Sequence, residues 1–180
     1  MKRNVWIFGL IMGAILAGNA VYMTTRIYHE PLSMKSNDLV GYAVLVVVLS
    51  LTFFGIRNYR NKELGGAISL GKAFKTGGMI ALVGSTLYVG VWICYYYLFI
   101  PDFIDKYTLC VLNEATLSGA SATELAAKKN EMQEFGEMYE NPLFVILISY
   151  AEVLPIGLVV AFISSLILKR KPKPESLSAS

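Results

Sequence analysis

The chain has 180 residues, of which 55% are hydrophobic and 16% are charged, and its formal net charge is +3. Soluble domains average roughly 45–50% apolar residues, so a membrane protein is the first class to test, and the small net charge does not indicate nucleic-acid binding. Two cysteines and one histidine are too few for a disulfide framework or a clustered metal site. We expect neither a metal nor a cofactor.

The apolar residues are gathered into four long runs. A helix needs about 20 apolar residues to cross a bilayer, and each run approaches or exceeds that length. The runs contain no Lys, Arg or Asp, and Glu152 is their only acidic residue. The sequence therefore predicts an all-α membrane protein with four transmembrane helices. These spans cover residues 5–25, 39–56, 78–100 and 143–168.

The first run follows Lys2 and Arg3 and ends near Gly18 and Ala20, which resembles a signal peptide with a cleavage site between small residues. Its apolar part is longer than the usual signal core of about 7 to 15 residues. We therefore expect an uncleaved span, whereas cleavage would leave three spans in the same orientation. The loop after it carries His29, which we interpret as a solvated side chain because no second ligand is near.

The stretch from Gly66 to Ala73 resembles a nucleotide-binding P-loop. A working P-loop joins a buried strand to a helix and ends in Ser or Thr, but this stretch follows a predicted span and ends in Ala73. We expect no nucleotide binding. Instead, residues 64–75 are predicted to form one interfacial helical face, with Lys72 and Lys75 turned toward anionic lipid headgroups.

Residues 101–141 are predicted to form a helical hairpin between the third and fourth spans. Ser121 and Glu124 have the spacing of a capping box, which starts a helix, and Pro142 after Asn141 ends it. The narrow apolar stripe of the second helix suits packing on the span ends, and alternatively contact with a partner protein.

Charge separates the two sides of the predicted bundle. With both termini inside, the inner segments hold eleven basic and two acidic residues, and the outer segments hold five basic and ten acidic residues. Basic residues are retained in short cytoplasmic segments. This bias predicts a multi-pass protein of the bacterial inner membrane with both termini in the cytoplasm. The transmembrane domain then covers residues 1–170, and residues 171–180 are predicted to be a disordered cytoplasmic tail.

Small residues recur at every fourth position in three of the predicted spans. Such ridges let helices approach closely in lipid, where no hydrophobic force drives them together. They favour a compact bundle and would equally suit a homodimer. The ridges are Gly9, Gly13 and Ala17 in the first span, Gly77, Ala81 and Ser85 before and within the third, and Gly157, Ala161 and Ser165 in the fourth.

Glu152 lies near the middle of the fourth span, where a charged side chain is costly and is a functional candidate by default. The spans contain no basic residue to pair with it, and Tyr88 and Asn19 are among the polar residues at comparable depth. A protonated, hydrogen-bonded glutamate could fix the helix register. A proton or cation site is an alternative reading, and snorkelling toward the outer face is a third.

Several short motifs along the chain resemble a family of uncharacterised bacterial membrane proteins that carry a domain of unknown function, found mostly in Bacteroidota. The resemblance implies a four-span inner-membrane protein and brings no established activity. Its motifs are FFGIR at residues 53–57, KELGG at 62–66, Ser69, GKAFK at 71–75, IPDF at 100–103, NPL at 141–143 and LILKRK at 166–171.

The sequence contains no paired carboxylates, no nucleophile with a base and no metal cluster. We therefore expect no enzyme, and favour a structural or interaction protein of the cell envelope. The alternative is a small transporter or channel subunit that uses Glu152. Expected partners are membrane lipids and either a second copy or another envelope protein, with no nucleic acid or nucleotide.

Overall fold

The computed structural model describes residues 1–29, 46 and 48–171. These residues are almost entirely helical and include no β-sheet, so the predicted all-α class is confirmed for this part of the chain. The helices are α1 (Lys2–His29), α3 (Leu51–Glu63), α4 (Leu70–Phe99), α5 (Phe103–Leu117), α6 (Ala122–Tyr139) and α7 (Pro142–Leu168).

Three of these helices, α1, α4 and α7, are long and apolar enough to cross a membrane. They contain most or all of the first, third and fourth predicted spans, and each extends beyond its prediction in at least one direction. Residues 39–45 and 47 of the second predicted span, residues 39–56, lie outside the described residues, and α3 contains only its last part, residues 51–56. The count of four spans therefore remains a prediction.

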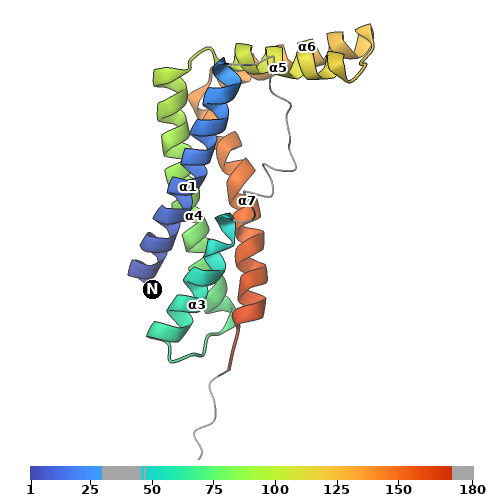
Figure 1. The fold of residues 1–180 in the computed structure, drawn as a ribbon. Coiled ribbons are helices and arrows are strands. Elements are labelled where there is room, and N and C mark those ends of the chain that lie inside the picture. Colours follow the sequence, from blue (N-terminus) through green and yellow to red (C-terminus); the bar gives the residue numbers. More distant parts are fainter. Residues whose placement is uncertain (30–45, 47, 172–180) are drawn as a thin grey trace, which may run out of the picture.

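The long helices α1, α4 and α7 run side by side, and α3 packs against them near Met1 (Figure 1). We call this the N-terminal end of the bundle. At the opposite end, the hairpin end, α5 and α6 project sideways across the bundle axis (Figure 1). The predicted tail beyond residue 171 lies outside the described residues.

The connection between α3 and α4 corrects one prediction. Residues 64–69 do not continue a helical face, because Gly65 and Gly66 have φ angles of 61° and 90°. This left-handed backbone suits glycine and terminates a helix. Ile68 then exchanges two backbone hydrogen bonds with Arg170, at 3.0 and 2.9 Å. The helical spacing of apolar residues from 64 to 74 was misleading because it did not take account of the glycine pair.

Local side-chain chemistry fixes the starts of α6 and α7. The predicted capping box is present: Glu124 accepts from the Ser121 amide at 2.7 Å, and Ser121 Oγ accepts from the Glu124 amide at 3.3 Å. Gly119, with φ of 82°, makes the turn before it. Asn141 caps α7 by accepting from the Leu143 amide at 3.0 Å.

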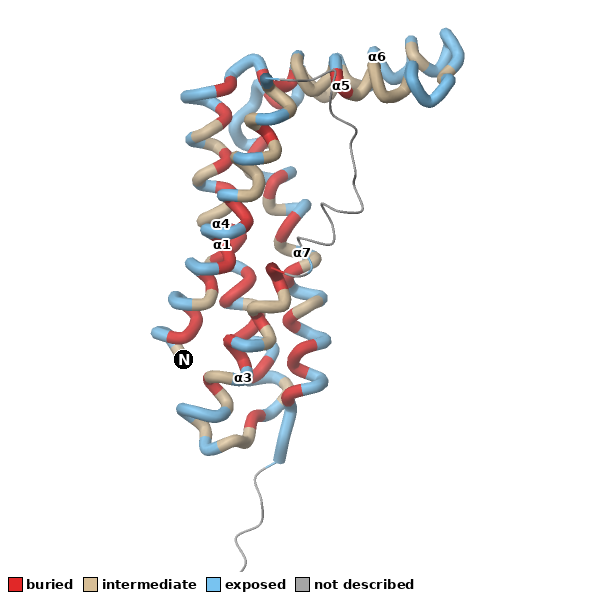
Figure 2. Tube along the Cα trace, in the orientation of Figure 1, coloured by how far each residue is buried: buried red, intermediate tan, exposed pale blue. Residues whose placement is uncertain are grey.

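The buried residues form a narrow interior between the helices of the bundle (red in Figure 2). Many large apolar side chains are exposed on its outer faces. Met12, Leu49 and Ile80 are fully buried. Large side chains such as Trp6 and Ile167 remain exposed along the same helices. Because a water-soluble monomer rarely exposes apolar surface this extensively, these faces fit a lipid environment. The hairpin differs, since α6 is buried only at Tyr139.

Candidate intramembrane polar site

Glu152 lies on α7, with its carboxyl group near the Tyr88 hydroxyl on α4. Glu152 is exposed, whereas Gly157 and Ala161 further along the same helix are buried. The carboxylate therefore lies at the edge of the α4–α7 contact, away from its closely packed side. The structure places Tyr88, one of the polar residues expected at comparable depth, near Glu152.

Two further polar side chains extend this arrangement toward the hairpin end. Trp92, one helical turn after Tyr88, donates from Nε1 to the Tyr139 hydroxyl at 3.1 Å. Burial raises the pKa of Tyr139 to about 12, with the Trp92 hydrogen bond opposing the rise and the charge of Glu152 adding to it. We call Glu152, Tyr88, Trp92 and Tyr139 the polar cluster.

A second polar link joins the same two helices. The Tyr150 hydroxyl donates to Thr86 Oγ1 at 2.8 Å, and Thr86 donates to the Leu82 carbonyl at 2.8 Å. Ser85 is fully buried, and its hydroxyl has no hydrogen-bond partner among the described residues. The α4–α7 contact thus carries several hydroxyl groups within an otherwise apolar stretch.

Asn19 does not join this arrangement. It is half-buried on α1, and the structure gives it no hydrogen bond within the described residues. Trp92 and Tyr139 were not predicted from the sequence as members of this site. The spacing of Tyr88, Trp92 and Tyr96 at every fourth residue was the available signal, because it places all three on one face of α4.

The small-residue ridges lie at the closest helix contacts. A Cβ atom built on Gly13 would lie 2.6 Å from the Gly84 carbonyl oxygen, and one on Gly9 would lie 2.8 Å from Val83. All nine predicted residues are buried. The α1 ridge packs at Gly84, a position absent from the predicted set, and the ridges of α4 and α7 face each other. The latter contacts are Gly77 with Ala161 and Gly157 with Ala81.

Sequence reasoning also missed a buried amide at the N-terminal end. Asn4 is only 4% exposed, and both the nitrogen and the oxygen of its side-chain amide form hydrogen bonds. Its Nδ2 donates to the Gly55 carbonyl, and its Oδ1 accepts from Asn58 Nδ2 at 2.6 Å. The only signal in the sequence was the position of two asparagines. Asn4 stands at the start of the first apolar run, and Asn58 follows the end of the second.

Lys72 and Lys75 are exposed on the first turns of α4, and the P-loop-like stretch connects helix α3 to helix α4. Within residues 1–29, 46 and 48–171, no group of three His, Cys, Asp or Glu residues is arranged to hold a metal ion.

Together, the lipid-compatible faces and the polar contacts between helices define a helical membrane bundle with a projecting hairpin. A family model described as a protein of unknown function (DUF4199) matches residues 7–170, so the chain belongs to this family. The resemblance found from the sequence motifs is thereby confirmed. Comparison with curated proteins and with solved structures gives no match.

Proposed function

We propose that the protein is a non-enzymatic interaction protein of the bacterial inner membrane, in which the bundle anchors the α5–α6 hairpin for contact with another envelope protein. The observation that carries this proposal is the weak attachment of the hairpin. Helix α6 is buried only at Tyr139 and projects sideways from the bundle (Figure 1). A helix that served only to cover the span ends would bury a continuous stripe.

The charge of the hairpin supports a basic partner surface. Residues 101–141 hold eight acidic and three basic side chains. Complementary charge increases association rate and selectivity at protein interfaces. The N-terminal end carries the opposite charge, and the retention of basic residues in the cytoplasm favours an extracytoplasmic hairpin.

Site-specific photo-crosslinking in intact cells tests this proposal. A photoreactive residue at exposed Gln133 on α6 is expected to form an adduct with a discrete envelope protein or with a second copy of the chain. Val159, 57% exposed on α7, is the control position and is expected to crosslink to lipid. Reversing Glu131, Glu134 and Glu137 to Lys is expected to remove the hairpin adduct. No discrete adduct from the hairpin, or one unaffected by charge reversal, would contradict the proposal.

The second candidate function is a small transporter or channel subunit, favoured by the polar cluster. Carboxylates within transmembrane helices often mark proton relays and ion pathways. Glu152→Gln is expected to abolish proton or cation flux into liposomes while the helical content is unchanged, if this candidate is correct. Glu140→Gln on the hairpin is the control. A variant that changes only stability would remove the residue on which this candidate depends.

A further inference from the structure

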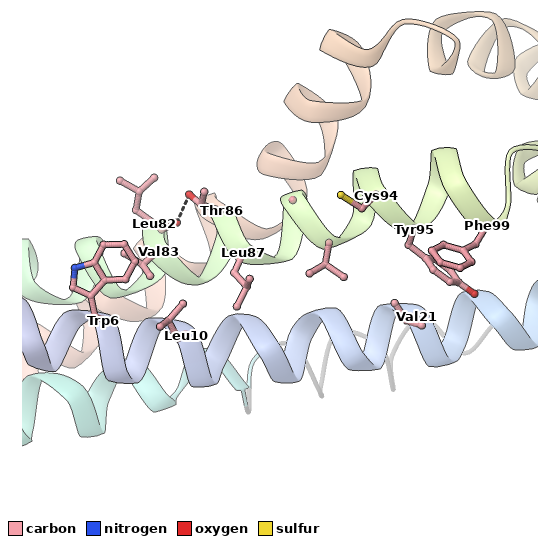
Figure 3. Close-up of a pocket in the computed structure, with 12 residues that line it drawn as sticks. Trp6, Leu10, Val21, Leu82, Val83, Thr86, Leu87, Cys94, Tyr95 and Phe99 are labelled. Atoms are coloured by element: carbon pink, nitrogen blue, oxygen red, sulfur yellow. Dashed lines mark hydrogen bonds between the residues drawn. The ribbon is translucent and has the colours of Figure 1, made fainter.

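An apolar groove of about 780 Å³ runs along the outside of the bundle between α1 and α4 (Figure 3). Trp6 and Leu82 lie toward its N-terminal end, and Tyr95 and Phe99 lie toward the hairpin end. Thr86 lines the groove, but its hydroxyl is already bonded to the Leu82 carbonyl at 2.8 Å. The groove therefore offers an occupant mainly apolar contacts along its length.

Glycine keeps part of this space open. Gly90 lines the groove, and a Cβ atom built there would meet nothing within 4 Å. The same helices are in close contact elsewhere, at Gly13 and Gly84. The groove thus lies beside a tight helix contact and is long and open, so that a flexible chain could lie along it.

Helix geometry places three cations on the groove side of α1 and α4, toward the N-terminal end of the groove. The contacts of Gly9 with Ile80 and Val83 show that α1 and α4 are paired in parallel, and this register places Arg3 level with Lys75. At 100° per residue, Arg3 lies about 60° from Trp6 on α1, and Lys75 lies about 20° from Leu82 on α4.

Lys72, one turn earlier on α4, also lies on the groove face, about 80° from Leu82. All three cationic side chains are exposed, and none makes an ion pair with another described residue. The apolar groove is therefore flanked at its N-terminal end by exposed cationic side chains that have no ion-pair partner among the described residues.

We propose that this groove binds an anionic phospholipid, with an acyl chain along Trp6, Leu10 and Leu82 and the phosphate at Arg3, Lys72 and Lys75. The inference rests on the proposed membrane placement of the bundle. Charge complementarity favours a lipid over a second copy, because the N-terminal end of the described chain is strongly basic and two such ends repel each other. A free phosphate ion would leave the apolar groove empty.

Quenching of tryptophan fluorescence by acyl-brominated lipids tests this site in liposomes. Trp6 is 57% exposed and Trp92 is 8% exposed, so Trp92 provides a nearly constant background. At equal mole fraction, brominated phosphatidylglycerol in phosphatidylcholine is expected to quench Trp6 more strongly than the reverse mixture, with an apparent preference of at least about fivefold. Trp6→Phe is expected to remove the lipid-dependent signal.

Two sets of variants separate the charge from the groove. Replacing Arg3, Lys72 and Lys75 by Gln is expected to reduce the preference to about one. Replacing Lys106, Lys128 and Lys129 of the hairpin by Gln removes the same charge and is expected to leave the preference unchanged. Gly90→Phe, whose Cβ atom would meet nothing within 4 Å, places a ring in the groove and is expected to weaken quenching by both lipids.

Equal quenching by the two lipids in the unmodified protein would overturn the anionic site and leave the membrane placement intact. Absence of quenching by either lipid would overturn both the site and the proposal that this face of α1 meets lipid. Energy transfer between labelled copies, together with protection of Trp6 from both lipids, would assign the groove to a second copy and overturn the lipid proposal.

Discussion

The two ends of the bundle are held together by different interactions. At the N-terminal end, hydrogen bonds join elements that are distant in sequence: Asn4 bridges α1 to α3, and Arg60 donates to the Leu168 carbonyl at 3.2 Å. The Met1 amino group also pairs with Glu63. At the hairpin end, aromatic rings carry most of the contact, as where Tyr96 lies 5.2 Å from Tyr139 between ring centroids.

This difference has a consequence for how each end can move. Buried hydrogen bonds between backbone and amide groups have fixed geometry and are costly to leave unmade, so the N-terminal end is expected to be rigid. Aromatic rings can shift against one another at a smaller cost. A hairpin attached in this way can reorient to meet a partner while the spans stay in register. The following predictions test this contrast, in order of decreasing effect.

The largest effect is expected from Gly13→Leu, which acts on the contact that holds both ends in register. A Cβ atom at Gly13 would lie 2.6 Å from the Gly84 carbonyl oxygen, and backbone cannot move aside as a side chain can. We expect the free energy of unfolding in detergent to fall by about 3 kcal/mol. Gly18→Leu on the same helix is the control, because a Cβ there would meet nothing within 4 Å. Equal losses for the two variants would contradict the packing account.

Asn4→Leu tests the N-terminal end. The substitution leaves the Gly55 carbonyl and the Asn58 amide without their partner, and we expect a loss of about 2 kcal/mol in unfolding free energy. Asn19→Leu is the matched control on α1, since no described hydrogen bond is lost there. A neutral or stabilising effect of Asn4→Leu would show that the hydrogen bonds of Asn4 do not hold the N-terminal end together.

Tyr139→Phe tests the hairpin end and should cost about 1 kcal/mol near neutral pH, because it removes the hydrogen bond from Trp92. The folded pKa of Tyr139 is about 12, above the ordinary value of 10.0. Its stabilisation is therefore complete below pH 10 and is lost as the pH rises from 10 to 12. Unfolding measured across this range should lose that pH-dependent component in Tyr139→Phe. An unchanged profile would show that Tyr139 is not held in its neutral form by the fold.

The smallest effect is expected for Ser121→Ala, which removes the cap of α6. The loss should be about 1 kcal/mol and confined to the hairpin, so hydrogen exchange should become faster in α6 and stay unchanged in α3. The carboxylate of Glu124 has a lowered pKa because it accepts hydrogen bonds from Ser121. The stabilisation that the ionised Glu124 side chain gives to the cap is present above the ordinary pKa of glutamate. It is lost as the pH falls below that value. Faster exchange in α3 as well would mean that the two ends are mechanically coupled.

The fold was predictable where one physical factor dominated. Long apolar runs located α1, α4 and α7, and the Ser121 and Glu124 pair located the start of α6. The connection after α3 was predicted wrongly because the backbone preference of Gly65 and Gly66 outweighed the helical spacing of apolar residues nearby.

The polar contacts were harder to predict, because they depend on which helix faces which. Tyr88 was named beside Glu152 because both are polar residues at similar depth, and the structure places the two side chains near each other. Tyr139 could not be found in this way, because its place beside Trp92 depends on the angle at which the hairpin leaves the bundle. Asn19 was chosen on depth alone, and depth does not specify the face of a helix.

The proposed function places the two ends of the bundle on opposite sides of a membrane. Cysteine labelling in intact cells tests this directly, with Cys94 and Cys110 first replaced by Ala. A membrane-impermeant maleimide is expected to label Lys129→Cys on α6 at once, and Lys62→Cys on α3 only after the membrane is permeabilised. Labelling of both positions in intact cells, or of Lys62→Cys alone, would contradict it.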